Sequence, residues 1–163
     1  MAAASPTTSA QYDQELAGGA VKQSAETHGK LQIHKMVYTT GSAGAGDLTA
    51  YPIGILPAGE LTIYPHLSTF WIADSAATSQ CDFGYGAFTN EDGTAVVADP
   101  NAWADSIDIA SGPTANTWAS DATIIRPTTY NSKGGIPVTV STDTADFPAS
   151  SSIELSVAYV LHG

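Results

Sequence analysis

The chain has 163 residues and a formal net charge of −11, a length that suits a single domain able to bury its own core. Hydrophobic residues make up 43% of it, which excludes intrinsic disorder over the whole chain. Charged residues make up only 13%, against about 25% in typical soluble domains. Such a composition is typical either of a β-protein with polar, turn-rich connections or of an assembly surface, whose short side chains a partner covers at little entropic cost.

The negative charge is unevenly placed along the chain. Three of the 16 acids lie before residue 37, where three lysines balance them, and the other thirteen face only Arg126 and Lys133. A body of this charge repels nucleic-acid phosphates and anionic lipid. We therefore expect neither nucleic acid nor a membrane as a partner.

The start of the chain, its apolar runs and its cysteine content together predict a cytoplasmic product. Met1 is followed by Ala, Ser, Pro and Thr and not by a charged and apolar leader. No apolar run reaches the roughly 18 residues that cross a bilayer. Cys81 is the only cysteine, so no intrachain disulfide is expected, and a lone cysteine usually packs as a small hydrophobe.

Residues 1–30 are predicted to be an N-terminal arm. Gly18 and Gly19 interrupt the segment, and Leu16 and Val21 are the only large aliphatic residues between Gln11 and Glu26. A helix there would have too little apolar surface to dock firmly. The arm is thus either a floppy terminus or a segment that neighbouring subunits order.

From residue 31 the pattern predicts strands, because apolar and polar residues alternate or gather in short runs between turn residues. In the first strand Leu31, Ile33, Lys35 and Val37 share one face, and His34 lies on the opposite, polar face. The last strand shows the clearest alternation, and its second face becomes apolar towards its end, as in a central strand. Residues 90–93 predict a tight turn and residues 99–116 a loop. The predicted strands are 31–38, 51–56, 60–64, 69–72, 81–88, 122–125, 136–140 and 153–161.

These elements predict an all-β fold for residues 31–163. Short strands at roughly ten-residue spacing, many turns and no convincing long helix are typical of an antiparallel β-sandwich of the jelly-roll kind. The chain is therefore expected to be one β-sandwich domain with an extended N-terminal arm.

The residues give little support for a chemical site. The four histidines, at positions 28, 34, 66 and 162, form no metal-binding pair or cluster. Asp99, Asn101, Asp105 and Asp108 form the densest group of oxygen ligands, but their spacing is not that of a calcium loop, so a solvated loop is the better interpretation. The Gly41–Gly46 segment lacks the Lys-Ser/Thr that completes a phosphate loop.

Nucleophilic catalysis has no signature either. A Gly-x-Ser-x-Gly motif is absent, and Cys81 has no base beside it in sequence. We expect no catalytic residue, no cofactor and no metal, and so a protein that is not an enzyme.

Aromatic residues gather between positions 64 and 88, and Trp103 and Trp118 follow. Aromatic side chains fill a sandwich core, anchor a subunit interface or stack on sugar rings. The third reading makes a carbohydrate-binding or adhesin-type fibre module the alternative function, with Trp71, Trp103 and Trp118 as the stacking residues.

The order of these segments resembles a known family. A strand ends near Pro57-Ala-Gly59, a Phe83-Gly-Tyr-Gly86 strand and an acidic turn follow, and an Ile-x-Leu-x-Val-x-Tyr-Val strand closes the chain at 153–160. In this pattern, residues 31–163 resemble the decoration or cement proteins of tailed-bacteriophage heads.

The resemblance implies a virion structural protein on the capsid exterior, made in the host cytoplasm. Such a protein binds the major capsid protein and stabilises the shell by bridging neighbouring capsomers, often as a homotrimer at symmetry axes. The resemblance supplies no catalytic residues, and it does not extend to residues 1–30.

Overall fold

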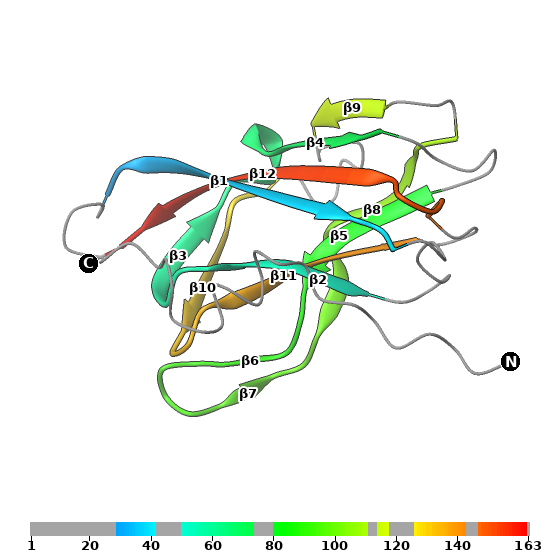
Figure 1. Ribbon diagram of the computed structural model, residues 1–163. Helices are drawn as coiled ribbons and strands as arrows, with labels where there is room; N and C mark the ends of the chain where they lie inside the picture. Colours follow the sequence, from blue (N-terminus) through cyan, green and yellow to red (C-terminus); the bar gives the residue numbers. More distant parts are fainter. Residues whose placement is uncertain are drawn as a thin grey trace, which may run out of the picture.

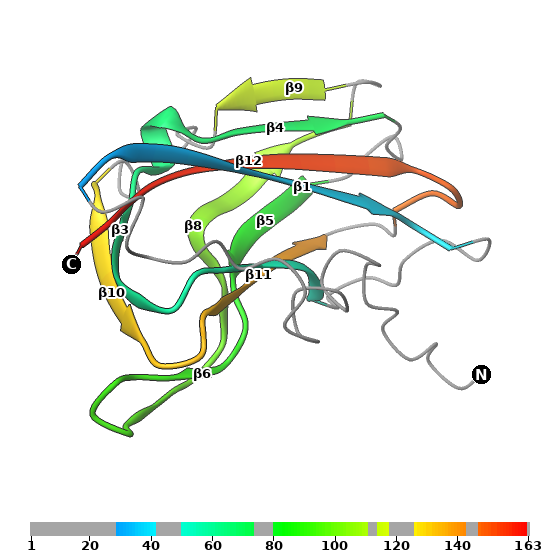
Figure 2. The same cartoon turned by 60° about the vertical axis from the view of Figure 1, so that its left-hand side comes forward.

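The structure is a computed structural model that describes residues 29–41, 50–73, 80–110, 114–117, 126–142 and 147–162, with only the backbone for 114–117. Nearly all of the predicted arm, the predicted strand 122–125 and most of the Gly41–Gly46 segment lie outside these ranges. Within them the fold is an all-β sandwich in which all strand pairs are antiparallel. Figures 1 and 2 show its two main sheets stacked face to face.

The last strand organises the larger sheet. One edge of β12 (Ser152–Leu161) pairs with β1 (Leu31–Thr39) over nearly its whole length. Its other edge pairs with β3 (Gly59–Ile63) and β4 (Thr69–Ile72), which a short 3-10 turn, η2 (Pro65–Leu67), connects. Strands β10 (Thr128–Ser132) and β9 (Thr114–Thr117) complete six strands. The prediction of a central final strand is therefore confirmed.

The second sheet has four strands in the order β2, β11, β5 and β8. These are β2 (Tyr51–Leu56), β11 (Ile136–Thr142), β5 (Gln80–Tyr85) and β8 (Asp99–Asp108). A two-stranded hairpin of β6 (Phe88–Thr89) and β7 (Ala95–Val96) projects from the lower end of the sandwich in Figure 1. The predicted turn at 90–93 connects these two strands.

Two predictions in this region are wrong. The predicted strand 81–88 is interrupted, since β5 ends at Tyr85 and β6 begins at Phe88. Gly86 still donates its N–H to the carbonyl of Pro137 at 2.9 Å, but Pro137 has no N–H with which to return a bond. The predicted loop from Asp99 contains strand β8, which lies at the edge of its sheet and meets β5 with register shifts. An edge strand with bulges tolerates Pro100 and the positive φ of Ser106 (52°), so the turn-forming residues do not prevent pairing.

The core lies between the two sheets and is large enough to hold the fold without a disulfide. The aromatic residues Phe70, Phe83, Trp103 and Phe147 are all at most 3% exposed. Phe70 and Phe83 lie on opposite sheets, and their ring centroids are 5.1 Å apart. Cys81 is buried among these apolar side chains and takes part in no disulfide. Core filling therefore accounts for Phe70, Phe83 and Phe88 among the aromatic residues between positions 64 and 88, and Tyr85 packs against this core while partly buried.

Strand β1 faces opposite to the direction that its sequence predicts. Met36 and Tyr38, which share a face with His34, are buried, and the face with Leu31, Ile33 and Val37 is exposed. The Tyr38 ring stacks on Tyr51 of β2 with centroids 5.9 Å apart. His34, which the sequence places on the more polar face of this strand, therefore lies half-buried on the face that turns towards the second sheet.

Candidate functional site

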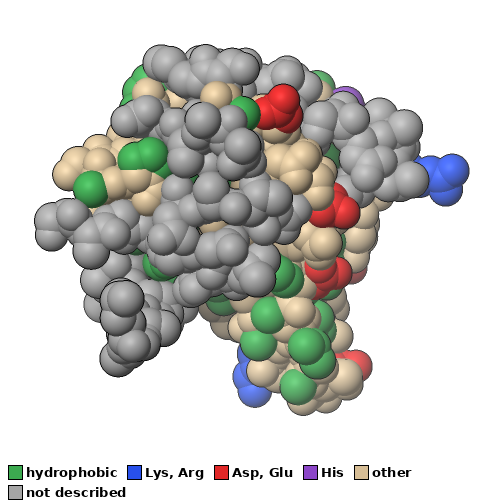
Figure 3. Space-filling view, turned by 90° about the vertical axis from the view of Figure 1, so that its right-hand side faces the viewer, with side chains coloured by type: hydrophobic (Ala, Val, Ile, Leu, Met, Phe, Trp, Pro, Cys, Tyr) green, Lys and Arg blue, Asp and Glu red, His purple; other side chains and the backbone are tan. Residues whose placement is uncertain are grey.

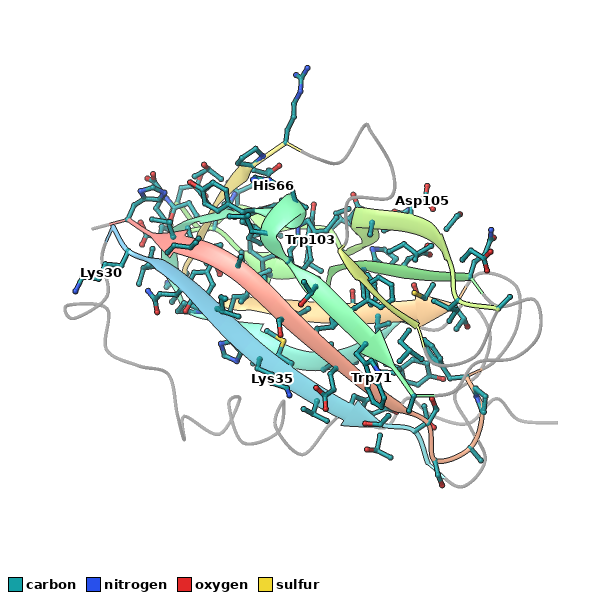
Figure 4. All side chains as sticks on the ribbon, turned by 90° about the horizontal axis from the view of Figure 1, so that it is seen from above. Lys30, Lys35, His66, Trp71, Trp103 and Asp105 are labelled. Carbon is teal, nitrogen blue, oxygen red and sulfur yellow. The ribbon has the colours of Figure 1, made fainter. Side chains whose placement is uncertain are left out.

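The outward face of β1 carries an apolar strip that solvent reaches. We define the strip by Leu31, Ile33, Val37 and Trp71, whose side chains are 53%, 67%, 40% and 38% exposed. Figure 4 looks onto this face, with β1, β12 and β4 side by side. Large apolar side chains concentrated on the solvent face of a sheet mark an interaction surface more often than isolated ones do.

Strand register places Trp71 beside the rest of the strip. Val37 is paired with Glu154 of β12, and Glu154 is paired on its other side with Trp71 of β4. Residues at paired positions point to the same face, with Cβ atoms about 5 Å apart. The strip therefore crosses three strands and includes a tryptophan, a residue type enriched at binding hot spots.

An ion pair lies beside the side chains of the strip. The Lys35 ammonium is 2.6 Å from Glu154 Oε2, and the two side chains are 59% and 35% exposed. Because the pair is open to water, it adds little to stability. It neutralises both charges inside the strip, which lowers the cost of covering the strip with a partner.

The inner end of the hairpin rests on an aromatic cluster, defined by Tyr85, Phe88, Trp103 and Tyr130. The ring centroids of Tyr85 lie 5.5 Å from Phe88, 5.8 Å from Trp103 and 5.4 Å from Tyr130. Trp103 donates its Nε1–H to the Tyr130 hydroxyl at 3.0 Å. The cluster anchors the projecting hairpin to the body of the sandwich.

Burial in this cluster raises the pKa of both tyrosine hydroxyls. Desolvation, and to a lesser extent the charge of Asp99, raises the pKa of Tyr85. Desolvation also raises the pKa of Tyr130 to about 12, although the hydrogen bond from Trp103 opposes the shift. Both hydroxyls are therefore neutral at physiological pH and serve as packing groups.

The structure separates most of the residues that the sequence singled out. The His162 ring nitrogen Nε2 lies 2.8 Å from the Thr62 hydroxyl, and His66 packs edge-on against Tyr64. Asp105 accepts a hydrogen bond from the Ser106 hydroxyl, and Asp108 accepts one from the N–H of Ala110. Across the described ranges, no three His, Cys, Asp or Glu side chains are grouped to hold a metal ion.

The three candidate sugar-stacking tryptophans do not form one platform. Trp71 is exposed, Trp103 is only 1% exposed, and Trp118 lies outside the described residues. Since a buried indole cannot stack on a sugar, Trp103 is removed from that site.

The sequence reasoning missed the strip, because an alternating strand normally turns its aliphatic face inward. The available signal was Met36 and Tyr38 on the supposedly polar face, which made both faces of β1 apolar. Among the helices of the described part, none has the length and apolar character to cross a membrane.

Comparisons with known proteins identify the fold. No protein-family model matches the chain, and no curated protein matches its sequence. A chain in the structure "Capsid of Ralstonia phage GP4" matches with a TM-score of 0.62 and 16% identity, over 91% of this chain and 95% of that one. A chain in the structure "Cyanophage Pam1 capsid asymmetric unit" matches with a TM-score of 0.52 and 12% identity, over 87% and 91%. The protein thus shares its β-sandwich, over nearly its whole length, with chains of two phage capsids.

Proposed function

We propose that this protein is a virion structural protein, namely a capsid decoration or cement protein of a tailed bacteriophage that acts without catalysis. It binds the outside of the major capsid shell and stabilises the shell by bridging neighbouring capsomers. Its partners are the major capsid protein and further copies of itself, with a trimer as the favoured assembly. Neither nucleic acid nor a membrane is part of this function, and the protein is made in the host cytoplasm.

The observation that carries the proposal is the exposed apolar strip on a sandwich whose fold recurs in phage capsids. Both structural matches span nine-tenths or so of each chain, so the similarity concerns whole chains of comparable size. The strip supplies a surface that burial against a shell subunit would stabilise.

The small size of the strip favours a protein that contacts two capsomers over one that binds at a single place. Its four side chains are each about half exposed, so covering them contributes about 1 kcal/mol each. That sum barely offsets the entropic cost of association, which is at least about 4 kcal/mol. A protein that contacts two capsomers, or that binds as an oligomer, gains affinity because its second contact is intramolecular.

The stabilisation itself follows from mass action. A protein that binds only the assembled shell shifts the equilibrium away from dissociated capsomers, by an amount that grows with its free concentration. Bound protein should therefore raise the temperature at which shells lose their contents.

The test is to mix purified protein with capsids that lack it and to measure occupancy after sedimentation. Ile33→Asp and Trp71→Ser should each lower the apparent affinity for the shell by tenfold or more, on the order of a hot-spot residue. Thr128→Asp is the matched control, because it places the same charge on an exposed residue of β10 at the other edge of the same sheet. Equal occupancy for the Ile33 variant and the control would contradict the proposed surface.

A further inference from the structure

The projecting hairpin carries a hollow along one side. The hollow has a volume of about 500 Å³, and the apolar residues Ile55, Ala87, Phe88 and Pro137 line it. Lys133 and Gly134, which follow strand β10, also border it, and both are exposed. The hollow therefore combines an apolar lining with a positive charge at its edge.

The other strand of the hairpin carries an exposed apolar projection, which we call the knob and define by Ala95, Val97 and Ala98. Val97, directly after β7, is 82% exposed, and its neighbours Ala95 and Ala98 are exposed as well. Figure 3 shows hydrophobic side chains gathered over the lower projection of the molecule. Glu91 and Asp92 form the exposed tip of the same hairpin, so the hairpin presents both an apolar knob and two negative charges.

Strand β6 separates the hollow from this knob. On one side Thr89 accepts a hydrogen bond from the N–H of Lys133 at 2.9 Å, and Asn90 forms a bridge with Ser132. On its other side β6 pairs with β7, with Thr89 opposite Ala95. The hollow and the knob thus lie on opposite sides of one element.

The hairpin is built rigidly enough to present both features. The N–H of Asn90 donates to the carbonyl of Thr94 at 2.8 Å, and the N–H of Thr94 donates to Asp92 Oδ1 at 2.8 Å. Phe88 packs against Tyr85 and Tyr130 at its base. A partner therefore does not have to order a loose loop, which lowers the entropic cost of binding.

We propose that a second copy of this chain occupies the hollow, with its Val97 against the apolar lining and its acidic tip facing Lys133. The two surfaces are complementary in apolar character and in charge. Lys133 is one of only two cations after residue 36, so most other faces of two such acidic bodies repel each other. This inference rests on the self-association included in the proposed function and assigns it a surface.

Because the two complementary surfaces lie on opposite sides of the hairpin, the contact is heterologous. Each copy offers its knob to one neighbour and its hollow to another, and such contacts form a ring when the rotation closes. A closed ring of three copies would satisfy all hollows and all knobs.

The experiment measures the mass of the full-length protein by sedimentation and light scattering, from about 1 to 100 µM, since association follows mass action. Wild-type protein should reach a defined multiple of the single-chain mass. Gly134→Leu should weaken association at least about tenfold, because Gly134 borders the hollow and a Cβ there meets no other atom within 4 Å, so that a Leu side chain adds bulk at the contact without disturbing the fold. Gly41→Leu is the matched control, since its Cβ also has open space and Gly41 is not part of the hollow.

A charge exchange tests the pairing across the contact. Lys133→Glu should weaken association, and adding Glu91→Lys to the same chain should restore part of it, while Asp92, whose Oδ1 accepts the Thr94 N–H in the turn, stays unchanged. Val97→Asp should also weaken it, and the high exposure of Val97 leaves the fold intact.

The inference is overturned if wild-type protein keeps the mass of one chain at all concentrations, if Gly134→Leu associates like Gly41→Leu, or if the charge exchange fails to restore association. Measuring the shell occupancy of the same variants distinguishes this inference from the proposed function. A protein that binds shells but never self-associates contradicts this inference alone, whereas one that self-associates but never binds shells contradicts the proposed function alone.

Discussion

The substitution Tyr130→Phe removes one hydroxyl from the aromatic cluster and leaves its packing volume nearly unchanged. The hydroxyl accepts a hydrogen bond from Trp103 Nε1 at 3.0 Å, and the Trp103 side chain is only 1% exposed. Without this acceptor, a buried indole N–H loses a partner that water cannot easily replace. The cost of such a loss is about 1 to 3 kcal/mol, so we expect the midpoint of thermal unfolding to fall by about 2 to 4 °C for each kcal/mol lost.

The same substitution should also change the dependence of stability on alkaline pH. The pKa of Tyr130 is raised to about 12 in the folded protein, against about 10 in an unfolded chain. Below pH 10 the hydroxyl is protonated in both states, and its contribution is fully present. Between about pH 10 and 12 the unfolded state loses the proton first, so the free energy of unfolding falls as pH rises. Tyr130→Phe should make this fall shallower.

Thermal and denaturant unfolding at about pH 8 and pH 11 would measure both effects. Tyr64→Phe serves as the control, because Tyr64 is only half-buried and lies outside the aromatic cluster, with its ring edge-on to His66. If Tyr130→Phe unfolds at the wild-type temperature and keeps the wild-type alkaline slope, then the buried hydrogen bond does not have the role that its geometry assigns to it.

Three further substitutions test the body of the sandwich by denaturant unfolding. Gly84→Ala should destabilise the protein by about 3 kcal/mol or more, since its Cβ would lie 2.1 Å from the carbonyl oxygen of Asp99; wild-type stability would show that β8 moves aside freely. Asp82→Ala should lower the free energy of unfolding by about 2 kcal/mol, because the buried Asp82 side chain accepts the N–H of Ser106 in β8 at 2.8 Å. A change below about 0.5 kcal/mol would argue against that role. Lys35→Ala should cost less than about 1 kcal/mol, because its ion pair with Glu154 is exposed to water; a larger loss would show that the pair supports the sheet.

The fold class could be read from the sequence because strand periodicity is a local property. Residues 51–56, 69–72 and 136–140 were predicted as strands and lie in strands, since apolar runs between turn residues have few other ways to bury their surface. The failure at β8 arose because local turn signals were overridden by burial in the core. Asp, Asn and Pro at 99–101 favour turns, yet β8 forms because Trp103 and Ile107 are buried in the core.

The candidate sites could not be read in the same way. Leu31, Ile33 and Val37 alternate as a buried face would, and only packing of Met36 and Tyr38 against the second sheet turns them outward. Strand pairing through β12 then brings Trp71 beside them. The hollow likewise joins Ile55, Ala87 and Lys133, which are distant in sequence.

The sequence by itself therefore determined a charge-poor, acidic, all-β chain with a central final strand, because composition and alternation act within a few residues. The tertiary structure decided which face of β1 is buried, where the hairpin projects and which side chains stay exposed. A strand has two faces that differ by a shift of one residue, and when both are apolar, only the fit of the whole core selects the one that solvent and partners reach.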